Sequence, residues 1–150
     1  MTPIAYKGLH VNVKKFLMLI THTEGTDRQG TPYNELFGLT NFVGYESHPN
    51  ILIKSKNYRS TAAGRYQILR ETWRYLKKKY PQLTFSPEDQ DSMAVILIKE
   101  QGAFDLVKAG KWEEAILKTN DCWASLPGSP YGQPTHSMAS ALKFLKTVKV

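Results

Sequence analysis

The chain has 150 residues, of which 41% are hydrophobic and 22% are charged, and its formal net charge is +7. This size and composition predict one soluble globular domain over residues 1–150, with enough apolar side chains for a hydrophobic core. Cys122 is the only cysteine, so no intrachain disulfide can form, and a disulfide-stapled secreted scaffold is excluded. The positive charge favours an anionic partner such as nucleic acid, a membrane surface or a charged cell-wall polymer, although it also serves solubility alone.

Neither a membrane span nor a secretion signal is predicted. The apolar run at residues 16–20 is too short to cross a bilayer. Residues 1–10 have no long apolar segment and no cleavage-site pattern. We therefore expect synthesis in a cytoplasm and no stable membrane insertion, and a target outside the cytoplasm would require another factor to release the protein.

The first predicted element is a helix that begins after Asn12, which is suited to cap it, and ends near Glu24. Its apolar side chains recur at the spacing of one helical face, namely Val13, Phe16, Leu17 and Ile20. Glu24 follows Ile20 by four residues and so continues this buried face. Gly25 comes directly after it and is a residue that commonly ends helices.

Glu24 is the first candidate for chemistry. Partial burial and the negative end of the helix dipole both disfavour an ionised carboxylate, so both raise its pKa towards that of an acid that keeps its proton at neutral pH. The alternative is a solvated side chain at a fraying helix end.

A small antiparallel sheet is predicted next. Short apolar runs at 36–37, 42–43 and 51–53 are separated by the turn residues Gly38, Gly44, Pro49 and Asn50. Residues 55–64 are polar and are expected to form a loop.

The rest of the chain has the pattern of helices. A helix from Arg65 to about residue 80 would present one face, made of Tyr66, Leu69, Trp73 and Leu76. Ser86 and Pro87 start a second helix, whose apolar run at 94–98 indicates burial on every side. Further helices are expected at 104–109, at 112–123 and after Thr135, the last two separated by a loop rich in Pro and Gly. This order predicts a mostly helical α+β fold with a small antiparallel β-sheet lobe, and a cleft between the lobes with Glu24 at their junction.

Candidate binding residues gather around the loops. Polar and aromatic side chains suited to a carbohydrate lie at the start of the helix after residue 60 and in the loop rich in Pro and Gly, namely Ser60, Thr61, Tyr66, Gln67, Tyr131 and Gln133. Ordinary loop polarity and core aromatics would explain the same residues. The four histidines are scattered without metal-ligand spacing and no phosphate-binding glycine loop is present, so neither a metal nor a cofactor is expected. Cys122 is expected to be a buried, inert thiol.

Several blocks of sequence, in order and spacing from about residue 14 to residue 133, resemble the motifs of lambda-type phage endolysins. The blocks are Glu-Gly-Thr-Asp at 24–27, His-Pro at 48–49, Ser-Thr-Ala-Ala-Gly-Arg-Tyr-Gln-Ile-Leu at 60–69, Phe-Ser-Pro at 85–87 with Gln-Asp at 90–91, Ile-Lys-Glu at 98–100 with Gly-Ala at 102–103, and Trp-Ala-Ser-Leu-Pro-Gly at 123–128 with Tyr-Gly-Gln at 131–133. The resemblance implies a lysozyme-like fold and cleavage of the β-1,4 bond between N-acetylmuramic acid and N-acetylglucosamine. It also implies a lytic transglycosylase that leaves a 1,6-anhydro sugar and whose single catalytic glutamate is Glu24.

The partner implied by this resemblance is the glycan strand of peptidoglycan rather than nucleic acid. We expect a monomer, made in the cytoplasm of a bacterial host and active on periplasmic peptidoglycan after release by another factor. Asn34 and Ser47 stand where lambda-type members can carry aspartates. That difference matters little to a mechanism with one glutamate.

Two alternatives remain open at this stage. A hydrolysing muramidase would need Asp27, Glu35 or Glu46 as its second carboxylate. A non-enzymatic module that binds cell walls or nucleic acid would use the basic surface alone.

Overall fold

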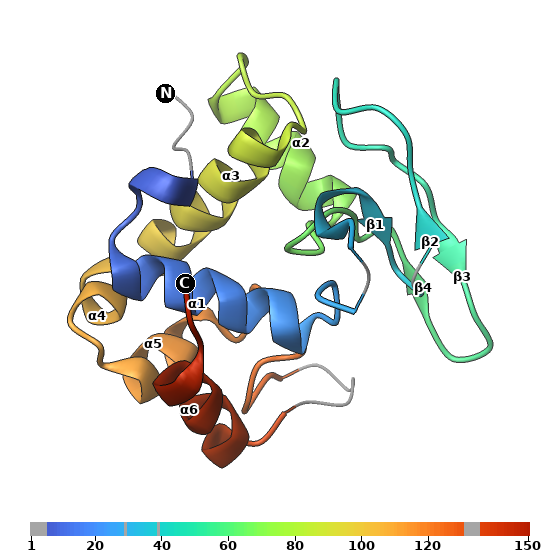
Figure 1. Ribbon diagram of the computed structural model, residues 1–150. Coiled ribbons are helices and arrows are strands. Elements are labelled where there is room, and N and C mark those ends of the chain that lie inside the picture. The colour runs from blue at the N-terminus through green and yellow to red at the C-terminus, as the bar shows by residue number, and fades with distance from the viewer. Residues whose placement is uncertain (1–5, 29, 39, 131–135) are drawn as a thin grey trace.

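The computed structural model describes residues 6–28, 30–38, 40–130 and 136–150 (Figure 1). Its helices are η1 (Tyr6–Gly8), α1 (Val11–Thr23), η2 (Pro32–Asn34), α2 (Arg70–Lys79), α3 (Pro87–Glu100), α4 (Phe104–Lys108), α5 (Trp112–Thr119) and α6 (Met138–Thr147). Its strands are β1 (Glu35–Leu36), β2 (Thr40–Asn41), β3 (Ile53–Lys54) and β4 (Arg59–Ser60). Figure 1 shows the strands gathered on one side of the molecule, α4, α5 and α6 on another side, and α1 between them. The observed architecture is α+β and mostly helical, as predicted.

Helix α1 begins two residues earlier than predicted. His10, not Asn12, is its N-cap, because the Nδ1 atom of His10 accepts a hydrogen bond from the Asn12 backbone N–H at 3.0 Å. The Asn12 side chain is thereby free to donate to the Lys108 carbonyl at 2.8 Å, which ties α1 to the end of α4. The other end agrees with the prediction, since Glu24 is the C-cap and Gly25 follows with a φ of 79°.

The strands form two separate hairpins instead of one sheet. Strand β1 pairs with β2, and β3 pairs with β4, both antiparallel. Strand β4 lies inside the segment predicted as a polar loop, because the Ser55 N–H donates to the Tyr58 carbonyl at 2.7 Å and closes a turn that brings β4 back along β3. Isolated bridges from Leu36 to Ala63 and from Ala63 to Ile68 attach β1 to the segment before α2.

Helix α2 begins at Arg70, five residues later than predicted from the apolar spacing. Between Ala63 and Ile68 the chain makes a tight turn, in which Gly64 has a φ of 80° and Gln67 a φ of 49°. Those left-handed backbone angles are incompatible with a right-handed helix. A Cβ atom on Gly64 would also collide with the amide oxygen of the buried Gln90, so this turn requires glycine.

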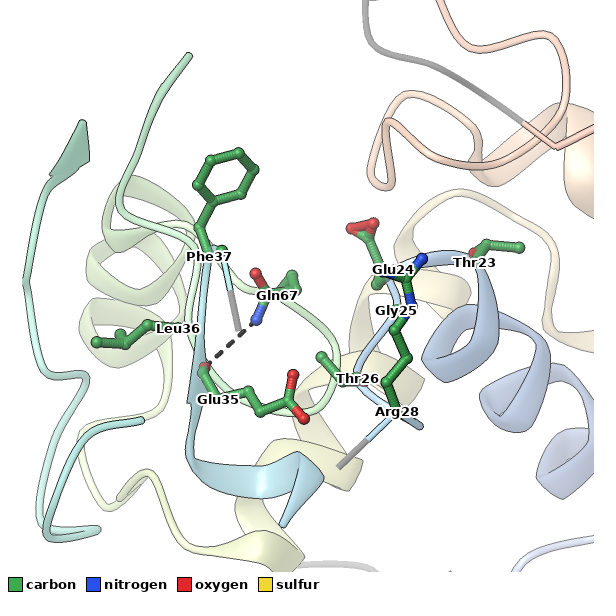
Figure 2. Close-up of a pocket in the computed structure, with 10 residues that line it drawn as sticks. Thr23, Glu24, Gly25, Thr26, Arg28, Glu35, Leu36, Phe37 and Gln67 are labelled. Atoms are coloured by element: carbon green, nitrogen blue, oxygen red, sulfur yellow. Dashed lines mark hydrogen bonds between the residues drawn. The ribbon is translucent and has the colours of Figure 1, made fainter. Parts of the chain in front are cut away.

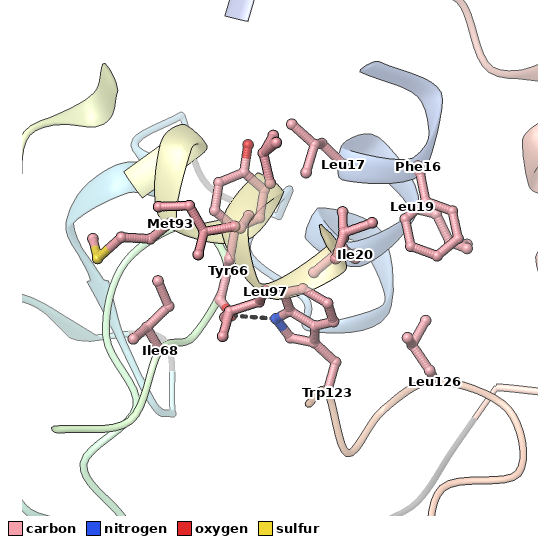
Figure 3. Close-up of a cluster of buried hydrophobic side chains, with 14 of the residues drawn as sticks. Phe16, Leu17, Leu19, Ile20, Tyr66, Ile68, Met93, Leu97, Trp123 and Leu126 are labelled. Carbon is pink, nitrogen blue, oxygen red and sulfur yellow. Dashed lines mark hydrogen bonds between the residues drawn. The ribbon is translucent and has the colours of Figure 1, made fainter. Parts of the chain in front are cut away.

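Helix α3 runs through the centre of the core. Ser86 caps it as predicted, accepting a hydrogen bond from the Asp89 N–H at 3.1 Å, and its residues from 89 to 98 are buried. Side chains of α1 pack towards Tyr66, Leu97, Trp123 and Leu126, as Figure 3 shows. Helix α5 ends at Thr119 rather than reaching Trp123.

The last helix, α6, is capped by Ser137, whose side chain accepts from the Ser140 N–H. Thr135, which the sequence suggested as this cap, lies outside the described residues. No helix in the described ranges is long and apolar enough to cross a membrane.

Candidate active site

The carboxyl group of Glu24 lies at the junction of the helical body and the hairpins. Helix α1 fixes the backbone of Glu24, because the Glu24 N–H donates a hydrogen bond to the Ile20 carbonyl at 2.9 Å at the end of this helix. Ser125, on the segment after α5, approaches from the side, with its Oγ atom 2.6 Å from Glu24 Oε2 and 3.0 Å from Thr23 Oγ1. The Ser125 hydroxyl has one proton and can donate to only one of these two oxygens. The Glu24 carboxylate is the stronger acceptor when it is ionised.

The environment of Glu24 favours the protonated carboxyl. Burial raises the pKa of Glu24 from its ordinary value to about 7, and the hydrogen bond from Ser125 lowers it in part. A carboxylic acid with this pKa is present at neutral pH in both its protonated and its ionised form. Both halves of a proton transfer are then available to one residue, which is the property of a general acid that later acts as a base.

Two cavities meet at Glu24. The smaller, of about 280 Å³, is also lined by the end of α1 and by the turn after β1, and Figure 2 shows Glu24 facing Phe37 and Gln67 across it. The larger, of about 430 Å³, extends along Ser60, Leu69 and the segment at 121–125. Both are lined by Thr23, Glu24, Phe37 and Gln67. An elongated ligand lying through both cavities would therefore pass the Glu24 carboxyl.

Gln67 and Ser60 are the two predicted binding residues that line these cavities. The Gln67 amide nitrogen donates to the carbonyls of Gly64 at 2.9 Å and Glu35 at 3.3 Å, which fixes the side chain against β1. Its positive φ is uncommon for a residue other than glycine, and such backbone strain is frequent at functional sites. Ser60 lines the larger cavity and accepts a hydrogen bond from the Ala62 N–H at 3.1 Å.

Tyr66 and Thr61 do not form the cleft wall that the sequence suggested. Tyr66 has an exposed fraction of 0%, and its hydroxyl donates to Asp91 at 2.6 Å inside the core. The hydroxyl oxygen of Thr61 accepts from the Arg70 N–H at 3.2 Å and so supports the start of α2. Tyr66 was assigned to the cleft because an aromatic side chain among the polar residues at 60–67 suits a carbohydrate site, whereas the turn at 63–68 directs it into the core. Tyr131 and Gln133 lie outside the described residues.

Sequence reasoning missed Ser125 and Phe37 as lining residues. Ser125 lies 101 positions from Glu24 in the sequence, so only the folded chain brings them together. Its one signal was its place inside the Trp-Ala-Ser-Leu-Pro-Gly block at 123–128.

Two further reactive side chains, Cys122 and His48, have surroundings that account for them without a catalytic role. Cys122 lines the larger cavity, but burial raises the pKa of its thiol to about 12, so it stays uncharged and unreactive. His48 is buried, with its two ring nitrogens bonded to the Ile68 carbonyl and the Asn50 N–H, and burial lowers its pKa. In the part of the chain that the structure describes, no group of three His, Cys, Asp or Glu side chains could hold a metal ion.

Comparison with known proteins gives a consistent result. A family model described as Endolysin matches residues 14–148. The chain is 38% identical over 139 residues to an endolysin of Escherichia phage lambda, covering 89% of this chain and 88% of that protein. It is 35% identical over 153 residues to an endolysin of Escherichia phage P2, covering 92% of this chain and 93% of that protein.

Solved structures agree with these sequence relatives. Bacteriophage lambda lysozyme complexed with a chitohexasaccharide matches with a TM-score of 0.86 and 36% identity, over 97% of this chain and 96% of that chain. A second structure of lysozyme from bacteriophage lambda matches with a TM-score of 0.82 and 35% identity, over the same shares of the two chains. The lysozyme-like α+β fold expected from the sequence is therefore confirmed.

Proposed function

The chain belongs to the endolysin family, and on that basis we propose that it degrades the glycan strands of bacterial peptidoglycan as a lytic transglycosylase. The bond cleaved is the β-1,4 linkage between N-acetylmuramic acid and N-acetylglucosamine, with a 1,6-anhydromuramyl product. The observation that carries this proposal is one carboxyl group, Glu24, with a pKa of about 7 at the meeting point of two cavities. The chitohexasaccharide bound by the lambda lysozyme supports a glycan strand as the ligand of the joined cavities.

The first step uses Glu24 as general acid. A glycan strand lying through both cavities presents a glycosidic oxygen to the protonated Glu24 carboxyl. Glu24 donates its proton to this oxygen as the bond from the anomeric carbon breaks, and the sugar passes through an oxocarbenium-like state. The Glu24 carboxylate that forms accepts the hydrogen bond of the Ser125 hydroxyl at 2.6 Å, which stabilises the charge at the moment when it appears.

The second step needs neither water nor a second carboxylate. The 6-hydroxyl of the same muramyl residue attacks the anomeric carbon, and its proton passes to the Glu24 carboxylate. One carbon–oxygen bond breaks and one forms, and Glu24 ends the cycle protonated. A residue whose pKa lies near neutrality is suited to both transfers.

The competing hypothesis is that the enzyme is a hydrolysing muramidase, which would require a second carboxylate. The Asp27 carboxylate contacts the Nδ1 atom of His22 at 2.8 Å, and Glu46 is exposed on the loop after β2. Neither residue lines the cavities at Glu24. Glu35 lines the smaller cavity together with Glu24, so a hydrolytic mechanism would have to use Glu35. Burial and the charge of Asp27 raise the pKa of Glu35, and such a shift strengthens a carboxylate as a base, so analysis of the reaction products must decide between hydrolysis and transglycosylation.

Mass analysis of digested peptidoglycan in heavy-oxygen water tests the proposal. Transglycosylation yields muramyl products that are one water lighter than hydrolytic products, have no reducing end and carry no heavy oxygen. Products that are mainly reducing and labelled would overturn transglycosylation in favour of hydrolysis. Absence of any clearing in a zymogram on bacterial cell walls would instead favour a binding module without catalysis.

A further inference from the structure

Glu35 is a buried carboxyl group that the transglycosylase mechanism does not use. Its exposed fraction is 1%, and its Oε1 atom has no hydrogen-bond partner in the described structure. It belongs to β1 and lines the smaller cavity on the wall opposite Glu24 (Figure 2). A buried carboxylate oxygen without a partner destabilises the folded protein, so its presence in the cavity needs an explanation.

The fold itself does not explain this carboxyl group. The contacts that hold β1 in place use the backbone of Glu35, whose carbonyl accepts from the Gly64 N–H at 2.7 Å and from the Gln67 amide at 3.3 Å. The charge of Arg28 lowers the pKa of Glu35, but no ion pair of Glu35 occurs within the described ranges. An apolar side chain of similar volume would preserve each of these backbone contacts.

Among the described residues, two other buried side-chain oxygens lack a partner, and they differ from that of Glu35. They belong to Asn34 and Asp89, and neither residue lines this cavity. The second carboxylate oxygen of Asp89 accepts from the Thr84 N–H at 2.7 Å and from its hydroxyl at 2.8 Å, so Asp89 has a structural role at the start of α3. Glu35 therefore combines burial, an unpaired oxygen and a place in the same cavity as Glu24.

The chemistry of the cavity fits one saccharide unit. Hydroxyl groups and acetamido N–H groups of a sugar are donors, and a carboxylate is an acceptor that can take more than one of them. Phe37, on the same cavity wall, offers an aromatic face to the apolar side of a sugar ring. Gln67 uses its amide donors on backbone carbonyls, so its amide oxygen and the Glu35 carboxylate are the side-chain acceptors on the β1 side of the cavity, and Glu35 is the one that can carry a negative charge.

We propose that Glu35 is a glycan-binding residue, which accepts a hydrogen bond from a hydroxyl or acetamido N–H of the saccharide unit in the smaller cavity. This unit is thereby held against β1 while the neighbouring glycosidic oxygen lies at Glu24. The inference rests on the proposed function, because it takes a glycan strand as the ligand of the joined cavities.

This role can be tested by measuring chitohexasaccharide binding by calorimetry. All of the proteins compared carry Glu24→Gln, so that the saccharide is bound but not cleaved. We expect Glu35→Leu in that background to weaken binding by about 10-fold or more, as for loss of a hydrogen bond to a charged group. Glu35→Gln keeps one acceptor oxygen and should weaken binding less. Glu46→Gln, an exposed glutamate on the same lobe, is the matched control and should bind as the parent does.

Thermal unfolding of the same proteins separates binding from folding. Glu35→Leu should leave the midpoint unchanged or raise it, because it removes an unpaired buried oxygen. Unchanged affinity in both Glu35 variants would overturn the inference while leaving the proposed function intact, and a lowered midpoint with unchanged affinity would assign Glu35 to the fold. If the Glu24→Gln parent itself fails to bind the saccharide, the proposed substrate class and this inference are both wrong.

Discussion

The Ser125 hydroxyl contacts the Glu24 carboxylate at 2.6 Å across 101 positions of sequence. Glu24 is placed by the end of α1, and Ser125 by the segment that follows α5 and packs under α1 through Trp123. The bond opposes the effect of burial on the pKa of Glu24. The acidity of the proposed catalytic group is therefore set jointly by two parts of the chain that are distant in sequence.

Glu24→Gln should abolish most of the lytic activity while preserving the fold. Glutamine keeps the size of the side chain and can still accept the Ser125 hydrogen bond, but it has no proton to give to a glycosidic oxygen. Loss of a general acid typically lowers rates by about 10²–10⁴-fold. The measurement is the initial rate of peptidoglycan cleavage, with Glu46→Gln as the same substitution at an exposed site. Activity above about a tenth of that of the unchanged protein would move the catalytic role to another residue.

Ser125→Ala should shift the pH dependence of activity. The Ser125 hydrogen bond lowers the pKa of Glu24, so its removal raises that pKa further. The protonated acid then persists to higher pH, and the limb on which kcat/KM falls with rising pH should move in the alkaline direction. The maximal rate should also fall, because the carboxylate formed in the first step loses its donor. A profile that coincides with that of Ser140→Ala, a control on the exposed face of α6, would show that Ser125 does not tune Glu24.

Tyr66→Phe should lower stability without lowering the activity of the folded enzyme. The substitution removes a buried hydroxyl that donates to Asp91 at 2.6 Å, at an expected cost of about 1–3 kcal/mol. Specific activity should hold, since Tyr66 is buried and lines neither of the two cavities at Glu24. Gln67→Ala is the contrasting variant, and it should lower specific activity because Gln67 lines both cavities. Chemical denaturation and initial rates on the same samples would distinguish them. A fall in specific activity for Tyr66→Phe as large as that for Gln67→Ala would return Tyr66 to the cleft wall.

Local sequence signals predicted two of the helix ends correctly. The Glu24–Gly25 end of α1 and the Ser86 start of α3 depend on residues within one helical turn, and the structure has both. The turn before α2 could not be predicted in this way, because Gly64 owes its geometry to Gln90, which is 26 positions away and fills the space where a Cβ would lie. The roles of Tyr66 and Ser125 likewise depend on contacts between distant segments, so residue type alone assigned the first wrongly and local patterns missed the second.

The stability of the protein should report the proton on Glu24 independently of catalysis. The pKa of Glu24 is about 7 in the folded protein and near its ordinary value of 4.5 when unfolded. Between those two pH values the folded state holds a proton that the unfolded state has lost, so the free energy of unfolding falls as pH rises. Stabilisation by this group is complete below the unfolded pKa and is lost as pH passes through the folded pKa. The loss amounts to at most about 3 kcal/mol. Burial also raises the pKa values of Glu35 and Asp91, so Glu24 is not the one carboxyl group whose protonation differs between the folded and unfolded states. The quantity to measure is therefore the difference in unfolding free energy between the unchanged protein and Glu24→Gln, across weakly acidic to neutral pH. We expect that difference to shift against the unchanged protein as pH rises. A difference independent of pH would mean that folding does not raise the pKa of Glu24, which would then be almost fully ionised at neutral pH and unsuited to be the acid of the first step.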